Sequence, residues 1–197
     1  VLVVAFTTIV TMCMVDGITK KSVAAMLGTV IGVVFSGAFA LIFGQVTSIT
    51  GYNVSDIENL VYVGEMTDIK IGELLFAGIL IASLGAVMDV GMSIASTLNE
   101  LKEQNPQMML KELFQSGMNV GRDMMGTMTN TLILAFTGGS INTLVFIFAY
   151  NYEYQQVINM YSVGIEIMQG LSSSLGVIMA VPVTSWIAAF LYSKNQK

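Results

Sequence analysis

Residues 84–96 read LGAVMDVGMSIAS, a run of apolar and small side chains with one carboxylate, Asp89, near its centre. The run lies inside a longer apolar stretch, residues 74–98, which exceeds the roughly 20 residues that a helix needs to cross a bilayer. A carboxylate at the centre of such a helix raises the free energy of membrane insertion by roughly 2.5–3.5 kcal/mol. We therefore expect a membrane-spanning helix in which Asp89 has either a partner or a function.

The composition extends this expectation to the whole chain. Hydrophobic residues make up 54 % of the sequence and charged residues 11 %, whereas about a quarter of the residues in soluble domains are charged. Lipid admits helices and closed barrels, because both pair all their backbone polar groups. The apolar runs are too long for barrel strands. The predicted fold class is therefore all-α, a polytopic transmembrane bundle forming one domain over residues 1–197.

Five apolar stretches approach the length of a membrane span: residues 1–15, 23–46, 74–98, 124–150 and 157–192. The first begins without a methionine, so we expect the chain to be truncated at its N-terminus. The last would be about 54 Å long as one helix, against a hydrocarbon core of ~30 Å. We expect it to break between Gly170 and Ser174, which gives about five spans plus short interfacial helices.

Lysine and arginine are distributed asymmetrically among the connections between these stretches. One set of connections holds Lys20, Lys21, Lys102, Lys111, Arg122, Lys194 and Lys197, and the opposite set holds Lys70. Because cytoplasmic loops carry the excess of these residues, we expect a cytoplasmic C-terminus and an outer loop over residues 47–73.

Two connections have helix-start patterns of their own. Ser55 and Glu58 form a capping-box spacing that predicts a short helix toward Val63. Asn105 followed by Pro106 predicts a second start. We expect the latter to open an amphipathic helix over residues 106–121, along the cytoplasmic interface.

Small residues recur at every fourth position of the second stretch: Ala24, Gly28, Gly32, Ser36, Ala40 and Gly44. This spacing places them on one helix face, where another helix backbone can approach closely. The stripe is either a static packing surface or a surface that slides or gates.

Polar residues near the inner ends of three stretches form the first candidate site. They are Asp16, Asp89, Asn119, Arg122, Asp123 and Asn130. Carboxylate, amide and hydroxyl oxygens suit a proton or a hard cation. The same residues also permit an ion pair from Arg122 to Asp89 or Asp123 that holds helix ends together. The sequence identifies no particular metal.

A second candidate site lies toward the outer side. Glu166 and Gln169 share a predicted helix face with Ser162 and Ser173. Glu166 lies either in the outer half of the membrane or, if the helix is interfacial, in solvent.

Several functional classes are disfavoured. The chain has no histidine and one cysteine, which excludes Ser-His-Asp and Cys-His catalysis and intrachain disulfides. We find no Gly-rich phosphate loop and predict neither a cofactor nor an enzymatic activity. The net charge of −5 argues against binding to nucleic acid.

Two motifs and their surroundings show a family resemblance. They are residues 85–90, GAVMDV, followed by SIAS at 93–96, and residues 121–128, GRDMMGTM, followed by NTL at 130–132. With residues 166–168, EIM, and Pro182, they resemble the bacterial YibE/F-like multi-span family. The resemblance implies a bacterial plasma-membrane protein, often encoded beside a similar partner. Many relatives have arginine where this chain has Gln169, so an ion pair to Glu166 is not carried over. The family's biochemical role is not established.

The leading hypothesis is a transporter or channel component for a cation or a proton-coupled small solute. The alternative is a membrane scaffold or assembly subunit, with polar residues joining helices. In either case we expect the protein to sit in the lipid bilayer and to form a homo-oligomer or to pair with a related subunit. Transport would require Asp89 and Glu166 to line one water-accessible cavity.

Overall fold

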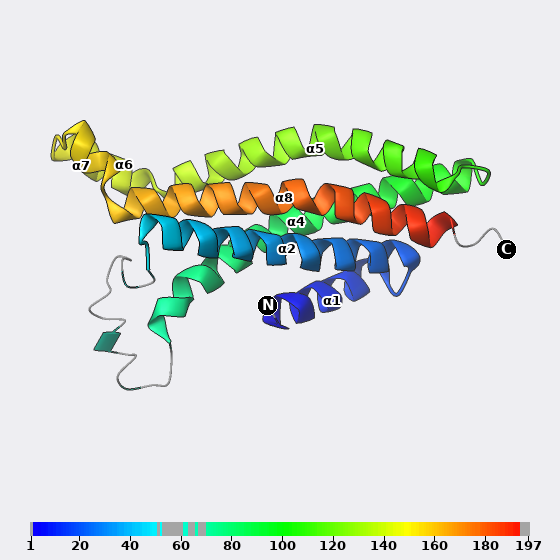
Figure 1. Ribbon diagram of the computed structural model, residues 1–197, viewed down its shortest axis with the longest axis horizontal. Helices are drawn as coiled ribbons and strands as arrows, with labels where there is room; N and C mark the ends of the chain where they lie inside the picture. Colours follow the sequence, from blue (N-terminus) through cyan, green and yellow to red (C-terminus); the bar gives the residue numbers. More distant parts are fainter. Residues whose placement is uncertain (1, 51, 53–60, 63–65, 67–69, 194–197) are drawn as a thin grey trace.

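The computed structural model describes residues 2–50, 52, 61–62, 66 and 70–193. Its helices are α1 (Leu2–Asp16), α2 (Lys20–Thr47), α4 (Ile71–Gln104), α5 (Leu110–Gly139), α6 (Ile141–Ala149), α7 (Tyr154–Ile158) and α8 (Tyr161–Ser193). The described residues contain no strand, so the all-α class is confirmed. Helices α2, α5 and α8 run along the long axis of the molecule, and α4 crosses them obliquely (Figure 1).

The number of membrane-length helices is smaller than expected. Among the described residues, α2, α4 from Glu73 and α8 are each long and apolar enough to cross a membrane. Helices α5 and α6 pass the same criterion only as a bent pair, which gives three or at most four candidate spans instead of about five. The difference lies in α1, because its 15 residues extend about 22 Å, less than the ~30 Å hydrocarbon core.

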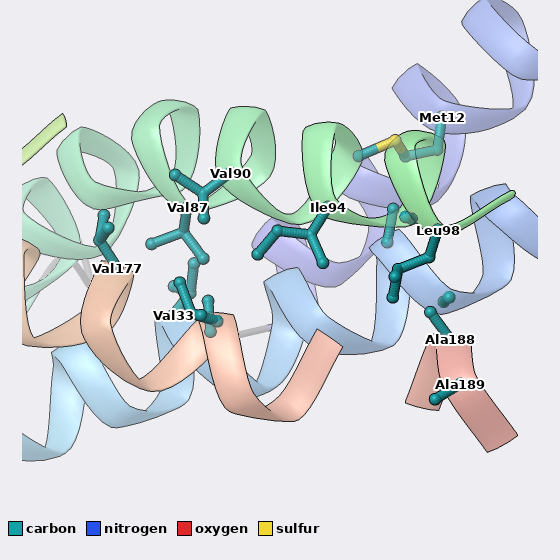
Figure 2. Close-up of a cluster of buried hydrophobic side chains, with 14 of the residues drawn as sticks. Met12, Val33, Val87, Val90, Ile94, Leu98, Val177, Ala188 and Ala189 are labelled. Atoms are coloured by element: carbon teal, nitrogen blue, oxygen red, sulfur yellow. The ribbon is translucent and has the colours of Figure 1, made fainter. Parts of the chain in front are cut away.

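Helix α8 occupies the centre of the bundle and packs against α2, α4 and α5. Fully buried side chains from three helices, including Val33, Val87 and Val177, meet between them (Figure 2). Met12 of α1 reaches the edge of this core. The side chains of α2, α4 and α8 therefore form one continuous core, and α5 packs against α4 and α8.

The small-residue stripe of α2 lies at this contact. Ala24, Gly28, Gly32, Ser36, Ala40 and Gly44 are all buried. A Cβ atom added to Gly28 would lie 1.9 Å from Thr184 Oγ1, and one added to Gly32 would lie 2.8 Å from the Cβ of Ala180. The backbones of α2 and α8 therefore approach so closely that only glycine fits at these two positions.

Helix α8 does not break where a break was expected. It is continuous from Tyr161 to Ser193, and the segment from Gly170 to Ser174 is helical. Ser172 and Ser173 are fully buried. The segment remains helical because its small side chains fit within the packed bundle. The break was expected because glycine and serine are poor helix formers.

Helix α5 also differs from expectation at both ends. Asn105 ends α4 and the next helix begins at Leu110, where the Glu112 carboxylate accepts a hydrogen bond from the Met109 N–H at 2.9 Å. The expected interfacial helix, residues 106–121, instead forms the first part of α5. Leu113 is buried in the core while Lys111 and Gln115 are exposed, so the segment is amphipathic and packs one face against the bundle.

The expected span over residues 124–150 is interrupted at Ser140. There the chain turns by 52° from α5 into α6. The short helix expected over residues 55–63 falls outside the described residues, apart from 61–62.

Candidate functional site

A pocket of about 540 Å³ lies where α5 and α6 bend away from α8. Phe136, Leu144, Ile167 and Leu171 contribute to its mostly apolar wall, and Thr129, Thr137, Ser140, Thr143 and Ser174 add hydroxyl groups. Glu166, which is half-buried, is the one ionisable residue among those that line it. The volume lies within the range of about 300–1,000 Å³ that is typical of small-molecule sites.

The bend that opens this pocket follows from local sequence. Gly138 and Gly139 weaken the end of α5, since glycine is the poorest helix former after proline. Ser140 then donates two hydrogen bonds to the Phe136 carbonyl, from its N–H at 3.0 Å and from its hydroxyl at 2.9 Å. These bonds close α5, and the chain restarts as α6 in a new direction.

The structure separates the two residues predicted for the outer site. Glu166 lines the pocket, whereas Gln169 on the next turn of α8 does not. Ser173, expected on the same face, is fully buried. Within the described part of the chain, the Glu166 carboxylate has neither an ion pair nor a hydrogen bond. An unpaired carboxylate therefore borders an apolar pocket.

The predicted inner residues lie on the outer faces of their helices. Asp89, Asn119, Arg122, Asp123 and Asn130 are all exposed. Asp89 lies near the middle of α4, which runs from Ile71 to Gln104. It does not line the pocket beside Glu166. The pocket that Glu166 lines is therefore not a cavity shared by the two carboxylates.

The ion pair expected from Arg122 to Asp89 or Asp123 is also absent. Salt bridges among the described residues join Asp16 to Lys21 and Lys70 to Glu73. The reason is the helical period: α4 and α5 turn their apolar residues into the core, which directs the polar residues on the opposite faces away from it. Arg122 was predicted in the connection between the third and fourth apolar stretches, but it lies within α5.

Asp16 has a local partner instead of joining an inner cluster. Its carboxylate accepts a hydrogen bond from the Lys21 ammonium at 2.5 Å, across the connection between α1 and α2. Gly17, at φ +68°, makes this tight connection possible because glycine adopts the left-handed conformation without a Cβ clash. Among the described residues, no group of three or more acidic or cysteine side chains could hold a metal ion.

A set of buried hydroxyl groups at the contacts of α8 was not predicted from the sequence. Thr29, Ser36, Ser172, Ser173, Thr184 and Ser185 each have a buried hydroxyl without a hydrogen-bond partner in the described structure. Thr29 and Thr184 lie close together, since a Cβ on Gly91 of α4 would come within 3.1 Å and 3.7 Å of their hydroxyl oxygens. The available signal was the repeated serine and threonine within an apolar stretch.

One comparison with known proteins gave a match. The family model described as YibE/F-like protein matches residues 1–194. No curated protein and no solved structure matches the chain. Because the family model covers nearly the whole sequence, the chain belongs to the YibE/F-like family.

Proposed function

We propose that this member of the YibE/F-like family forms a pathway across the bacterial plasma membrane for a cation or a proton-coupled small solute. The supporting observation is the pocket beside Glu166. It combines a carboxylate, several hydroxyl groups and apolar walls at the bend of a membrane-length helix pair. Interrupted helices supply such sites in many transporters, because the break exposes polar groups where a solute can reach them.

The chemistry of Glu166 favours a positively charged or protonated occupant. The walls beside Glu166 are mostly apolar, so its carboxylate is the strongest electrostatic partner that this pocket offers to a cation. It can take up a proton or attract a cation, and the hydroxyl oxygens of Thr137 and Ser140 line the same pocket. A carboxylate that binds and releases a proton or a cation is one way to couple that ion to transport.

The inner end of the pathway is proposed to use Asp89 and Asn130, each on an exposed helix face. Asp89 lies outside the Glu166 pocket, and Asn130 directly follows Thr129, which lines it. Transport would then require a route along the outer faces of α4 and α5.

Flux into proteoliposomes tests the proposal. We expect the wild-type chain to carry sodium, potassium or protons, measured with ion-selective and pH-sensitive dyes, and Glu166→Gln to abolish the flux. The matched control is Glu153→Gln, which changes an exposed carboxylate outside the pocket. Equal flux in the wild type and Glu166→Gln would rule out the pocket as the site.

A non-transporting assembly subunit is the second candidate. It is favoured by four exposed side chains of α5 that have no side-chain partner within the described chain: Asn119, Arg122, Asp123 and Asn130. This candidate predicts a lack of flux for every ion tested in wild-type protein that is folded and correctly inserted.

A further inference from the structure

The outer face of α5 carries an unusual set of exposed residues. Asn119, Arg122, Asp123, Gly126 and Asn130 all point away from the bundle. No described residue forms an ion pair with Arg122 or Asp123. A Cβ added to Gly126 would meet nothing within 4 Å, so open space lies beside the helix there. We call these five residues the α5 polar face.

The α5 polar face has a definite arrangement of charge about its centre. Successive helical residues are about 100° apart around the axis, which places Arg122 about 40° to one side of Gly126 and Asp123 about 60° to the other. Asn119 and Asn130 lie within about 40° of the Gly126 line, one before it and one after it. The centre of the face thus holds Gly126 and the two asparagine amides, with Arg122 on one flank and Asp123 on the other.

This arrangement is complementary to itself. In a two-fold symmetric pair of parallel helices, the left flank of one helix faces the right flank of the other. Arg122 of each copy would then face Asp123 of the partner subunit, which gives two ion pairs with no net charge. The amide groups both donate and accept hydrogen bonds, so each can pair with its own counterpart. Gly126 allows the two backbones to approach closely.

We propose that the α5 polar face is the contact surface for a second copy of this chain. The guanidinium and the carboxylate are exposed on α5, part of the bent membrane-length pair α5–α6, and neither has an ion-pair partner within the described chain. A second copy satisfies both charges with residues that are already present. This inference shares Asn130 with the proposed pathway, but it requires neither the pocket nor a flux, so the dimer test and the flux test can fail separately.

Site-directed cross-linking in native membranes tests the contact. In a Cys13→Ser background, Gly126→Cys and Asn130→Cys should each form a disulfide-linked dimer on oxidation. The matched control is Thr131→Cys, an exposed position on the same helix about 140° from Gly126. It should give at least tenfold less dimer. Equal dimer yields at Gly126→Cys and Thr131→Cys, or an adduct of Gly126→Cys with a different protein, would overturn the proposal.

Charge exchange provides a second measurement that does not depend on cross-linking. Differently tagged Arg122→Asp and Asp123→Arg chains should each fail to co-purify with copies of themselves, since like charges then meet. Co-expressed, the two variants should associate, and the double variant Arg122→Asp/Asp123→Arg should again self-associate. Thermal melting checks that every variant is folded. Loss of association in the charge-exchanged double variant, with folding retained, would also overturn the proposal.

Discussion

Glycine residues in this bundle lie in two kinds of environment, which differ in the space beside the Cα atom. At Gly28 and Gly121 a neighbouring side chain of α8 already occupies the position of a Cβ atom. At Gly85 and Gly126 that position is open. The same substitution should therefore have opposite effects at the two kinds of site.

Gly28→Ala should destabilise the folded bundle by about 1–3 kcal/mol. The new Cβ would lie 1.9 Å from Thr184 Oγ1 and 2.9 Å from its Cβ, so α2 and α8 must separate. Gly85→Ala, the control, should be neutral or stabilising by up to about 1 kcal/mol, because alanine favours the helix. Thermal melting in detergent measures both. A stabilised Gly28→Ala variant would contradict the close approach of α2 and α8.

Thr184→Val should stabilise the bundle by about 1 kcal/mol. The Thr184 hydroxyl is fully buried and lacks a partner in the described structure, and valine replaces it with a methyl group of similar shape. Thr97→Val is the control, since the Thr97 hydroxyl donates to the Ser93 carbonyl at 2.8 Å. It should not increase stability. A less stable Thr184→Val variant in the same melting assay would indicate that the hydroxyl has a partner such as bound water.

At the scale of single elements, the bend between α5 and α6 is the feature most closely tied to the proposed function. Residues on both sides of the bend, including Thr137 and Thr143, line the Glu166 pocket. The local causes of the bend are Gly138, Gly139 and the hydrogen bonds donated by Ser140. Both glycines have open space beside them, so alanine fits at either position without a clash.

The double variant Gly138→Ala/Gly139→Ala should reduce flux while it raises the melting temperature. Alanine favours helix by roughly 1 kcal/mol per replaced glycine, which favours a straight α5–α6 helix and a smaller pocket. Proteoliposome flux and thermal melting are measured on the same preparation. Unchanged flux with higher stability would show that the bend is not needed for transport.

At the scale of the whole molecule, the ends of the helices are arranged consistently. The α1–α2 connection, the α4–α5 connection and the end of α8 lie at one end of the bundle, and α7 lies at the other (Figure 1). Lys20, Lys21, Lys102 and Lys111 therefore gather at one end. A bundle inserted with this end inside satisfies the preference of cytoplasmic segments for positive charge.

Cysteine labelling should report opposite sides for the two ends. In a Cys13→Ser background, Gln155→Cys should react with a membrane-impermeant maleimide in intact cells. Gln107→Cys should react only after permeabilisation. Both positions are exposed in the structure. Labelling of both in intact cells would contradict the orientation predicted from the lysine distribution.

The sequence by itself determined the fold class, because long apolar runs with few charges leave only helices in lipid. It also selected Glu166 as a candidate, since an isolated carboxylate stands out in such a run whatever its neighbours, and the structure places this residue at a pocket. The four-residue stripe that begins at Ala24 pointed to a close helix contact, because periodicity alone defines a face. These inferences depend on local pattern and on the solvent, and neither changes when the chain folds.

Only the tertiary structure decided where the elements end and which polar groups meet. The segment from Gly170 to Ser174 is helical with its serines buried in the bundle, and core contacts of Leu113 accompany the inclusion of the expected interfacial helix in α5. Asp89 and Arg122 do not pair, because each helix turns its larger apolar face inward and the two polar faces outward. Helix boundaries and side-chain partners depend on the relative rotation of packed helices, which a single sequence does not encode locally.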